Sequence, residues 1–411
     1  MVSITPFRAL RPSPAEARAL ASRPYDVLNS EEAREAVKNN PASFLRITKS
    51  EVDLPPTTDI HSQAVYDKAR ENLDAFIQKG LLFREKKACY YIYTLEMNGR
   101  QQTGLVCCSA VADYENGLIK KHEFTRPEKE QDRINHIKTT GAQTGNVFLA
   151  YRNVAEIDSV IGSWKKEHAP VYDFTADDGI RHTVWVIEED AVIARITSLF
   201  AEKVPATYIA DGHHRAASAA KVKNAFGSKV PAGAQSFLTT LFPAAELKIM
   251  DYNRLVKDLN GLEAEELISA LHDDFEITLI GSEAYRPEEL HDFGMYLEGK
   301  WHKLRAKNES YSSDPIGLLD VTILSENILK KHLGIKDQRT DKRIDFVGGI
   351  RGLLELEQRV NSGEMAVAFS LFPVSIAQLF AIADSGEVMP PKSTWFEPKL
   401  RDGLLTHLIG D

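Results

Sequence analysis

Apolar and polar positions alternate along this chain with two different periods. Apolar residues that recur every three or four positions predict amphipathic helices, whereas alternation with a period of two, rich in β-branched and aromatic residues, predicts strands. The two kinds of segment are interleaved along the whole chain, which is typical of an α+β architecture with mixed sheets and surrounding helices. Helices are expected at residues 14–21, 30–39, 61–79, 190–201, 253–259, 262–272, 320–329 and 350–362, and strands at residues 89–97, 101–111, 145–151, 182–187, 236–242, 275–280, 295–297, 301–304 and 365–371.

Local turn signals sharpen two of these boundaries. Asn98-Gly99 separates two β-rich segments and is the dipeptide most typical of a two-residue hairpin loop. Pro24 lacks an N–H group and biases Arg23 toward an extended backbone, so the chain cannot be helical there. We therefore expect Asp26 on a loop between the first two helices.

Length, composition and charge limit the classes of protein that fit. A chain of 411 residues is long enough for two or three lobes, and 43% hydrophobic with 27% charged residues is typical of a soluble globular protein. The formal net charge of -9 makes nucleic-acid binding unexpected, because such proteins carry a basic face. Three cysteines are too few for a disulfide framework, and no apolar stretch has the length of a membrane span. We expect a cytoplasmic protein without a membrane partner.

The most informative segment covers residues 207–220 and reads T-Y-I-A-D-G-H-H-R-A-A-S-A-A. Its first residues resemble the end of a buried strand, and its alanines are typical of a tightly packed helix, so residues 211–215 should form the turn between them. Such a turn exposes backbone N–H groups at the positive end of a helix dipole. The segment therefore predicts an anion site, which we call the phosphate box (residues 211–215).

The side chains of the phosphate box fit a phosphate or nucleotide. Gly212 would let the backbone approach a ligand, and Arg215 can hold two phosphate oxygens with parallel hydrogen bonds. His213 and His214 add donors that titrate near neutral pH. A simpler interpretation is that Asp211 caps an ordinary helix. Cationic side chains are unfavourable at a helix N-terminus unless an anion is bound there, so the phosphate interpretation is favoured.

A second charged segment follows the predicted hairpin, at residues 120–133. A segment of this kind most often forms a solvated loop and helix face. Its basic side chains could also neutralise phosphate, and its carboxylates are ligands that Mg²⁺ prefers, a pairing suited to a metal–nucleotide complex. The candidates for phosphate or nucleotide binding are Lys121, His122, Arg126 and Arg133, and the candidates for metal binding are Glu123, Glu130 and Asp132.

A third segment, residues 389–399, reads M-P-P-K-S-T-W-F-E-P-K. It could be a terminal arm whose two aromatic residues pack on the body of the protein. It could also contribute polar contacts to a nucleotide or an acidic substrate, because its prolines reduce the entropy lost on ordering. In that interpretation the substrate-binding residues are Lys392, Ser393, Thr394 and Lys399.

Four separated motifs carry a resemblance to a known family. They are P-Y-D-V at residues 24–27, K-H-E-x-T at residues 121–125, D-G-H-H-R at residues 211–215 and the segment at residues 389–399. With these motifs the chain resembles the family catalogued as domain of unknown function 1015. The D-G-H-x-R turn between strand and helix resembles the phosphate-binding box of the ParB and sulfiredoxin-like superfamily, and the doubled histidine is most similar to its free-serine kinase branch.

This resemblance implies a domain organisation. A ParB/sulfiredoxin-like phosphate-binding core with large insertions would occupy residues 1–235, with an inserted lobe at about residues 51–200. A C-terminal α+β lobe at residues 236–411 would complete the site. The sequence has no G-x-x-x-x-G-K-S/T segment, so a P-loop is excluded as the source of the phosphate site.

The resemblance also implies a function, namely a kinase that uses ATP or ADP with Mg²⁺ to phosphorylate a free hydroxylated metabolite such as L-serine. The kinase branch takes its base from a carboxylate near the N-terminus, and here Asp26, Glu31 and Glu32 remain alternatives. A nucleotide-binding ParB-like regulatory protein associated with DNA and a nucleotide phosphohydrolase are the competing functions, and the chain could form a homodimer. The candidate catalytic residues are Asp26, Glu123, Asp211 and His213.

Overall fold

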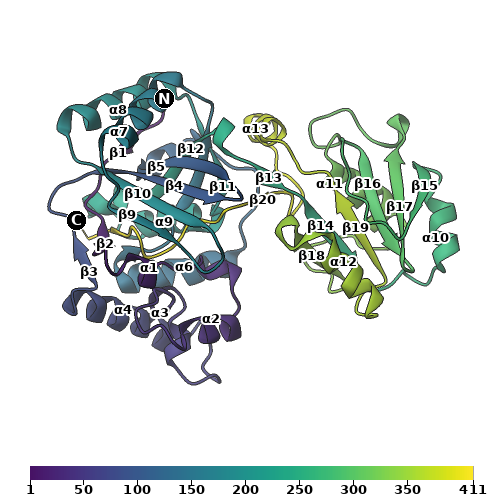
Figure 1. Ribbon diagram of the computed structural model, residues 1–411, viewed down its shortest axis with the longest axis horizontal. Coiled ribbons are helices and arrows are strands. Elements are labelled where there is room, and N and C mark those ends of the chain that lie inside the picture. The colour runs from purple at the N-terminus through teal and green to yellow at the C-terminus, as the bar shows by residue number, and fades with distance from the viewer. Residues whose placement is uncertain (411) are drawn as a thin grey trace. The chain divides into compact units, whose positions relative to one another are not determined.

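The computed structural model describes residues 1–410, and its contacts divide the chain into two compact units (Figure 1). The first unit contains Met1–Leu247 together with the segment that starts at Pro398, and the second contains Lys248–Glu397. The first unit combines helices with a mixed sheet and the second combines helices with an antiparallel sheet, so the α+β class predicted from the hydrophobic periods is confirmed.

The first unit is built on a nine-stranded mixed sheet with the order β6-β11-β8-β12-β5-β4-β10-β9, to which β1 is added at β5. Within it, β12 is parallel to β8 and antiparallel to β5, and β11 is antiparallel to β8. The strands are β1 (Ile4–Thr5), β4 (Tyr90–Met97), β5 (Arg100–Ala110), β6 (Ile119–Lys120), β8 (Val147–Tyr151), β9 (Tyr172–Thr175), β10 (Arg181–Ile187), β11 (Thr207–Asp211) and β12 (Ser236–Pro243).

The hairpin expected at Asn98-Gly99 is confirmed. Met97 pairs with Arg100 across a two-residue loop in which both residues have positive φ, 53° for Asn98 and 74° for Gly99. This conformation matches the twist of the two flanking strands, which explains why the Asn-Gly dipeptide is favoured there.

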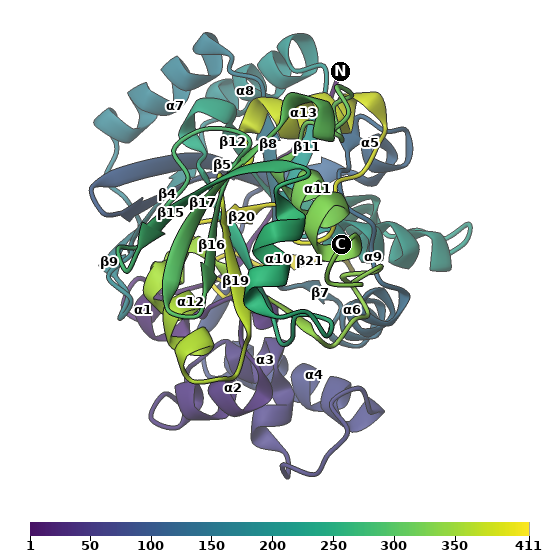
Figure 2. The same ribbon diagram turned by 90° about the vertical axis from the view of Figure 1, so that its right-hand side faces the viewer.

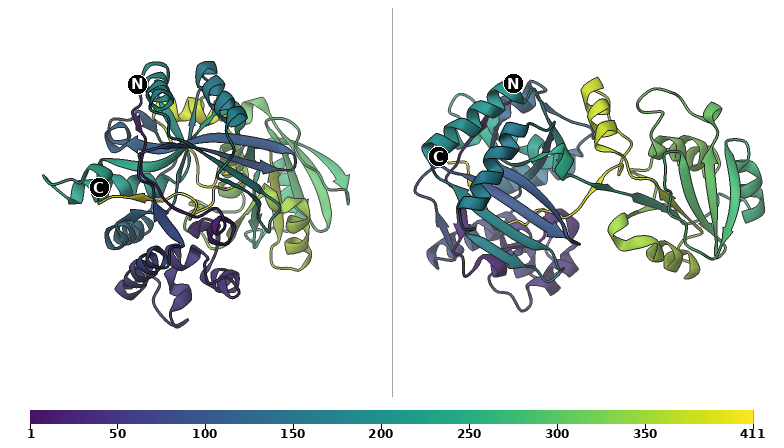
Figure 3. Two further views of the ribbon diagram at one scale, coloured as in Figure 1. Left: turned by 60° about the vertical axis from the view of Figure 1, so that its left-hand side comes forward. Right: turned by 45° about the horizontal axis from the view of Figure 1, so that its top comes forward.

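Helices surround the sheet of the first unit. Figure 3 shows α7 and α8 side by side next to the sheet, and α6 packs along both α4 and α9. The helices are α1 (Ala17–Leu20), α2 (Ser30–Val37), α3 (Leu45–Thr48), α4 (Gln63–Gln78), α5 (Val111–Glu115), α6 (Pro127–Thr140), α7 (Ala155–Glu167), α8 (Asp190–Lys203) and α9 (His213–Ala225), and a 3₁₀ turn, η1, covers Tyr25–Val27.

The C-terminal segment of the chain returns to the first unit. Leu10 pairs with Thr406, and Ser22 pairs with Asp402, so this segment runs beside the N-terminal residues that lead into η1. Two short strand pairs complete the unit, β2 (Leu10–Pro12) with β3 (Leu82–Arg84) and β7 (Ala142–Gln143) with β21 (His407–Leu408).

The second unit contains a six-stranded antiparallel sheet in the order β15-β17-β16-β19-β14-β18, against which α12 packs (Figure 2). Its strands are β14 (Tyr252–Val256), β15 (Phe275–Gly281), β16 (Asp292–Leu297), β17 (Lys300–Ala306), β18 (Ile344–Gly348) and β19 (Val367–Leu371), with a separate pair of β13 (Ile249–Met250) and β20 (Trp395–Phe396). Its helices are α10 (Ala264–Leu271), α11 (Asp320–Leu324), α12 (Gly352–Asn361) and α13 (Ile376–Ser385).

Two expectations differ from this architecture. The helix expected at residues 253–259 is wrong, because β14 lies between β18 and β19 and is buried on both faces, which removes the alternation that marks a strand. The division between the units falls after Leu247 instead of after residue 235, because β12 pairs with both β5 and β8 of the first unit.

Among residues 1–410, no helix combines the length and the apolar character needed to cross a membrane.

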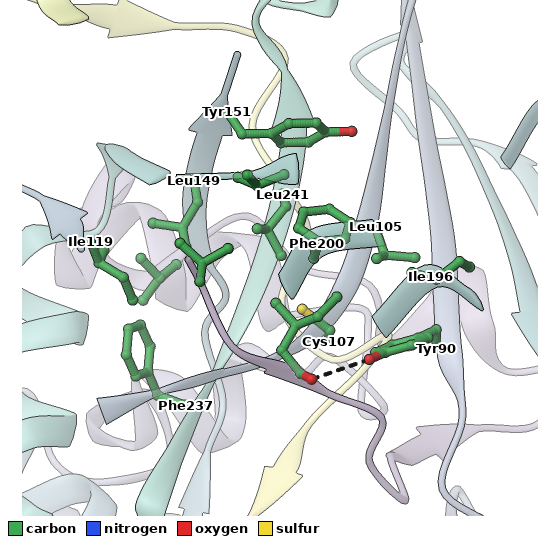
Figure 4. Close-up of a cluster of buried hydrophobic side chains, with 14 of the residues drawn as sticks. Tyr90, Leu105, Cys107, Ile119, Leu149, Tyr151, Ile196, Phe200, Phe237 and Leu241 are labelled. Carbon is green, nitrogen blue, oxygen red and sulfur yellow. Dashed lines mark hydrogen bonds between the residues drawn. The ribbon is translucent and has the colours of Figure 1, made fainter. Parts of the chain in front are cut away.

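A large apolar cluster holds the first unit together. Phe200 of α8 is fully buried in it beside Leu105, Tyr151 and Leu241, which project from three strands of the sheet (Figure 4). The rings of Phe200 and Tyr151 meet edge to face with their centroids 5.2 Å apart. Aromatic pairs in this geometry add to the stabilisation that burial provides.

We predict that Phe200→Ala lowers the free energy of unfolding by about 3–5 kcal/mol, because it leaves a cavity in this cluster. Phe124→Ala is the matched control, since the Phe124 side chain is 70% exposed and its removal should change stability by less than about 0.5 kcal/mol. Urea denaturation of the two variants measures the difference. Equal losses would mean that Phe200 is not part of the stabilising core.

Candidate phosphate-binding site

The phosphate box has the strand–turn–helix geometry that the sequence predicts. β11 ends at Asp211, α9 begins at His213, and Gly212 between them has φ +96° and ψ 30°. A Cβ atom on Gly212 would lie 3.1 Å from Cζ of Arg215 and 3.4 Å from Cα of Val147. Gly212 is therefore required both for its left-handed backbone and for the close approach of the Arg215 guanidinium.

Arg215 lies at the centre of the box with only 10% of its side chain exposed. One terminal nitrogen, Nη1, donates to the carbonyl of Asn146, and Nη2 lies 3.5 Å from Oδ2 of Asp26 and 3.6 Å from Oδ1 of Asp211. Nε is buried and has no hydrogen-bond partner among residues 1–410. Burial lowers the pKa of Arg215, but the carboxylates of Asp26 and Asp211 outweigh it and raise the pKa above its ordinary value. The guanidinium is therefore permanently charged.

Asp211 is held in its ionised form by two cations. Nζ of Lys399 donates to Oδ2 of Asp211 over 3.0 Å, and Arg215 lies beside Oδ1. Burial alone would raise the pKa of Asp211, but Lys399 and Arg215 hold it well below the usual range. The returning C-terminal segment thus supplies one of the charges of the box.

His213 of the box contacts a second buried histidine, His122. The rings of His122 and His213 are nearly perpendicular with centroids 4.6 Å apart, and Nδ1 of His213 lies 3.9 Å from Oε2 of Glu123. Nε2 of His213 is buried and lacks a hydrogen-bond partner among the described residues. Burial lowers the pKa of His122 to about 4 and that of His213 well below its ordinary value. Both rings are therefore neutral at pH 7. The sequence alone predicts that His213 titrates near neutral pH, and burial prevents this.

His214 connects the box to α6. Its Nε2 accepts a hydrogen bond of 2.9 Å from the backbone N–H of Arg126, the residue that precedes α6. Burial lowers the pKa of His214 to about 4, so the ring is neutral and able to accept this bond. His214 and Arg126 thereby hold the start of α6 next to the start of α9.

The 3₁₀ turn η1 brings Asp26 to the box. Tyr25 in this turn is covered by the guanidinium of Arg133, whose Cζ lies 3.9 Å from the centre of the Tyr25 ring. Of the three carboxylates expected as alternatives near the N-terminus, Glu32 accepts from the backbone N–H of Asn29 in a capping box. Glu31 is exposed in the first turn of α2. Asp26 is the one whose carboxylate lies near Arg215.

The three candidate metal ligands do not converge. Glu130 is bound by Lys221 and Thr125, whereas Asp132 is bound by Arg133 and by the hydroxyl of Tyr66. Residues two apart on a helix point about 200° away from each other, which explains why these two carboxylates have different partners. Within residues 1–410, no group of three His, Cys, Asp or Glu side chains is arranged to hold a metal ion.

The remaining candidates are spread over both units. Nζ of Lys121 lies 4.6 Å from the centre of the Tyr114 ring. Of the four residues expected to bind substrate, Lys399 belongs to the first unit, whereas Lys392, Ser393 and Thr394 belong to the second. In the second unit the carbonyl of Lys392 accepts from the buried Arg254, and the Ser393 hydroxyl donates to Pro390, so both residues fix the local backbone.

A cleft of about 860 Å³ opens beside the turn that carries Asp26. Its walls include Arg23 and Leu28, which flank η1, and it is large enough for a small-molecule ligand. Charged side chains of both signs line it, namely Arg18, Arg23, Glu32, Glu35, Asp177, Asp178 and Arg401.

Sequence reasoning missed several residues of this site. Asn146 contributes through its backbone carbonyl, which no sequence motif reveals. Tyr25 enters the sequence pattern only as part of the P-Y-D-V motif. Asp402 is buried close to Arg215, and its position depends on the return of the C-terminal segment, which local patterns do not encode.

The chain matches the family described as Protein of unknown function (DUF1015) over residues 4–322 and therefore belongs to that family. No curated protein matches it. Among solved structures, a conserved hypothetical protein from Pyrococcus furiosus is 16% identical with a TM-score of 0.36, over 74% of this chain and 95% of that chain. A free serine kinase in complex with AMP is 13% identical with a TM-score of 0.36, over 73% and 92% of the two chains. SbnI with a C-terminal truncation, from Staphylococcus aureus, is 12% identical with a TM-score of 0.40, over 74% and 87%.

We predict that Gly212→Ala weakens phosphate binding because its new Cβ would push against the guanidinium of Arg215. Gly179→Ala is the matched control, since Gly179 also has a positive φ, +80°, but has nothing within 4 Å of the added Cβ. Both variants should lose about 1–2 kcal/mol of stability from the left-handed backbone. Calorimetric titration with ADP should show weakened binding for Gly212→Ala and unchanged binding for Gly179→Ala; equal affinities would argue against the box as the phosphate site.

Proposed function

We propose that this protein is a small-molecule phosphotransferase that uses ATP or ADP, with Mg²⁺, to phosphorylate a free hydroxylated metabolite such as L-serine. The proposal rests mainly on one contact. Nη2 of Arg215, in the first turn of α9, lies 3.5 Å from Oδ2 of Asp26. A phosphate cradle and a candidate base thus lie within one small site. Phosphoryl transfer needs these two elements together with a divalent ion.

The start of α9 supports the role of cradle. The first N–H groups of a helix have no partner inside the helix, and the helix dipole favours negative charge at this end. In α9 the first intrahelical bond runs from the N–H of Ala216 to the carbonyl of Gly212, so the N–H groups before it point toward the turn. Arg215 and Lys399 add two charges beside them. A phosphate group would satisfy both the backbone donors and these cations.

Asp26 is the best candidate for the base. Its carboxylate lies on a short turn at the edge of the cradle, and 34% of its side chain is exposed to solvent. A carboxylate in this position could take the proton of an acceptor hydroxyl as the phosphoryl group is transferred. The imidazole of His213 is neutral, and its Nε2 has no hydrogen-bond partner among residues 1–410. His213 is therefore the candidate for a hydrogen bond to the phosphoryl group during transfer.

The cleft beside η1 supports a polar acceptor. An acceptor that carries both a carboxylate and an ammonium group, as a free amino acid does, would find partners of both signs among the side chains of this cleft. A small polar molecule there would lie next to the Asp26 turn. Arg23, whose side chain is 53% exposed, is the candidate for its carboxylate.

The metal would depend mainly on the nucleotide. Mg²⁺ usually keeps several waters and takes one or two carboxylates together with phosphate oxygens. Glu123 lies beside His213 with 41% of its side chain exposed, and it is the candidate ligand. The ion would supply charge neutralisation for the phosphates.

Two other functions use the same cradle. A nucleotide phosphohydrolase would replace the acceptor hydroxyl by water, and a ParB-like regulator would bind nucleotide in order to associate with DNA. Two measurements separate the three functions. In the first, purified protein is incubated with ATP, ADP or CTP and a panel of free amino acids and polyols, and phosphate release and product phosphorylation are measured. In the second, binding of duplex DNA is measured at several salt concentrations with and without CTP. Phosphorylated product supports the transferase, and phosphate release alone supports the hydrolase. Salt-sensitive binding of duplex DNA, strengthened by CTP, supports the regulator.

We predict that Asp26→Asn lowers kcat for transfer by roughly 10²- to 10⁴-fold, the contribution typical of a positioned acid or base. Affinity for nucleotide should stay the same or increase, because a negative charge beside Arg215 is removed. Glu31→Gln is the matched control, since Glu31 is exposed on α2 and should leave kcat unchanged. An unchanged kcat in Asp26→Asn would exclude Asp26 as the base.

A further inference from the structure

The returning C-terminal segment brings a second acidic residue, Asp402, to the phosphate box. Its backbone exchanges two hydrogen bonds of 3.0 Å with the backbone of Ser22, which lies just before η1. Asp402 is only 2% exposed. The same segment carries Lys399, which binds Asp211. One short stretch of chain therefore contacts both the N-terminal turn and the box.

The carboxyl group of Asp402 lies between Tyr25 and Arg215. It faces the backbone N–H of Tyr25, the residue before Asp26, and this N–H opposes the rise in the pKa of Asp402. A Cβ atom placed on Gly145 would lie 3.4 Å from Oδ1 of Asp402 and 3.2 Å from Cδ of Arg215, so both side chains approach the same point of the backbone. Oδ2 of Asp402 is buried without a hydrogen-bond partner among residues 1–410.

The charge around Asp402 favours its protonated form. Burial raises the pKa of Asp402 to about 8. The positive charges of Arg215 and Arg133 oppose this rise, whereas the negative charge of Asp26 adds to it. The titratable and charged groups that face it are Tyr25, Asp26, Tyr93, Arg133 and Arg215. Arg215 already lies near the carboxylates of Asp26 and Asp211, and a charged carboxylate on Asp402 would reduce its attraction for phosphate.

We infer that Asp402 is a positioning residue of the phosphate box. Its buried carboxyl group lies against both Arg215 and the Asp26 turn and holds the backbone of that turn in place. The part of this inference that concerns phosphate rests on the proposed function, whereas the part that concerns the uncharged state of Asp402 does not.

The two parts are tested separately. Between about pH 4 and about pH 8, the folded protein keeps a proton on Asp402 that the unfolded chain has released, so the contribution of this group to stability falls as the pH rises through that window. An asparagine cannot titrate and keeps the same shape. The melting temperature of Asp402→Asn, relative to the wild type, should therefore rise by about 5 °C or more between about pH 5 and about pH 8.

Asp177→Asn is the control for this measurement, because the Asp177 side chain is 97% exposed and the difference from the wild type should not change with pH in this way. If Asp402 were an ordinary ion-pair partner of Arg215, its carboxyl would already be ionised at about pH 5, and the difference in melting temperature between Asp402→Asn and the wild type would not change between about pH 5 and about pH 8. That result would overturn the inference.

The second arm measures affinity for ADP at about pH 7 by calorimetric titration. Asp402→Asn should bind ADP within about twofold of the wild type, whereas Asp402→Ala, which cannot hold the Tyr25 backbone, should bind roughly tenfold more weakly. Wild-type affinity in Asp402→Ala would overturn the positioning role. If the wild type itself binds no nucleotide, the proposed function fails, and the melting comparison still decides the state of Asp402.

Discussion

The buried guanidinium of Arg215 is the constraint on which the site depends. A charge taken out of water costs several kcal/mol unless other groups compensate for it. Here the compensation comes from distant parts of the chain: Asp26 from the N-terminal turn, the carbonyl of Asn146 before β8, and Asp211 at the end of β11. These segments must meet for the charge to be tolerated. The surrounding sheet of the first unit fixes two of them, β8 and β11, as neighbours.

The third segment, the N-terminal turn, has little regular structure of its own and is held by contacts. Arg133 covers Tyr25, and the C-terminal segment pairs with Ser22. Arg133 is in turn fixed by its ion pair with Asp132, so the charged residues of α6 act through the position of this turn. The charged segment at residues 120–133 therefore contributes more to the geometry of the site than to a cluster of metal ligands.

Much of the box could be predicted from the sequence because its signals are local. The glycine, the preceding buried strand and the alanine-rich helix all lie within residues 207–220, and the Asn98-Gly99 hairpin is equally local. The strand β14 was missed because burial on both faces removes its periodicity. The role of Asp402 cannot be predicted from the sequence, because it depends on the return of the chain to the first unit at Pro398. That return depends on tertiary contacts. The low pKa values of the histidines likewise depend on burial, which no motif encodes.

The central claim is that Arg215 holds a phosphate group through paired hydrogen bonds. Calorimetric titration of ATP and ADP into the wild type and into Arg215→Lys tests it most directly, because lysine keeps the charge but cannot reproduce the planar, two-pronged contact. We expect clear binding to the wild type and binding to Arg215→Lys that is weaker by roughly tenfold or more, the loss of one charge-assisted hydrogen bond. Equal affinities, or the absence of nucleotide binding to the wild type, would contradict the account.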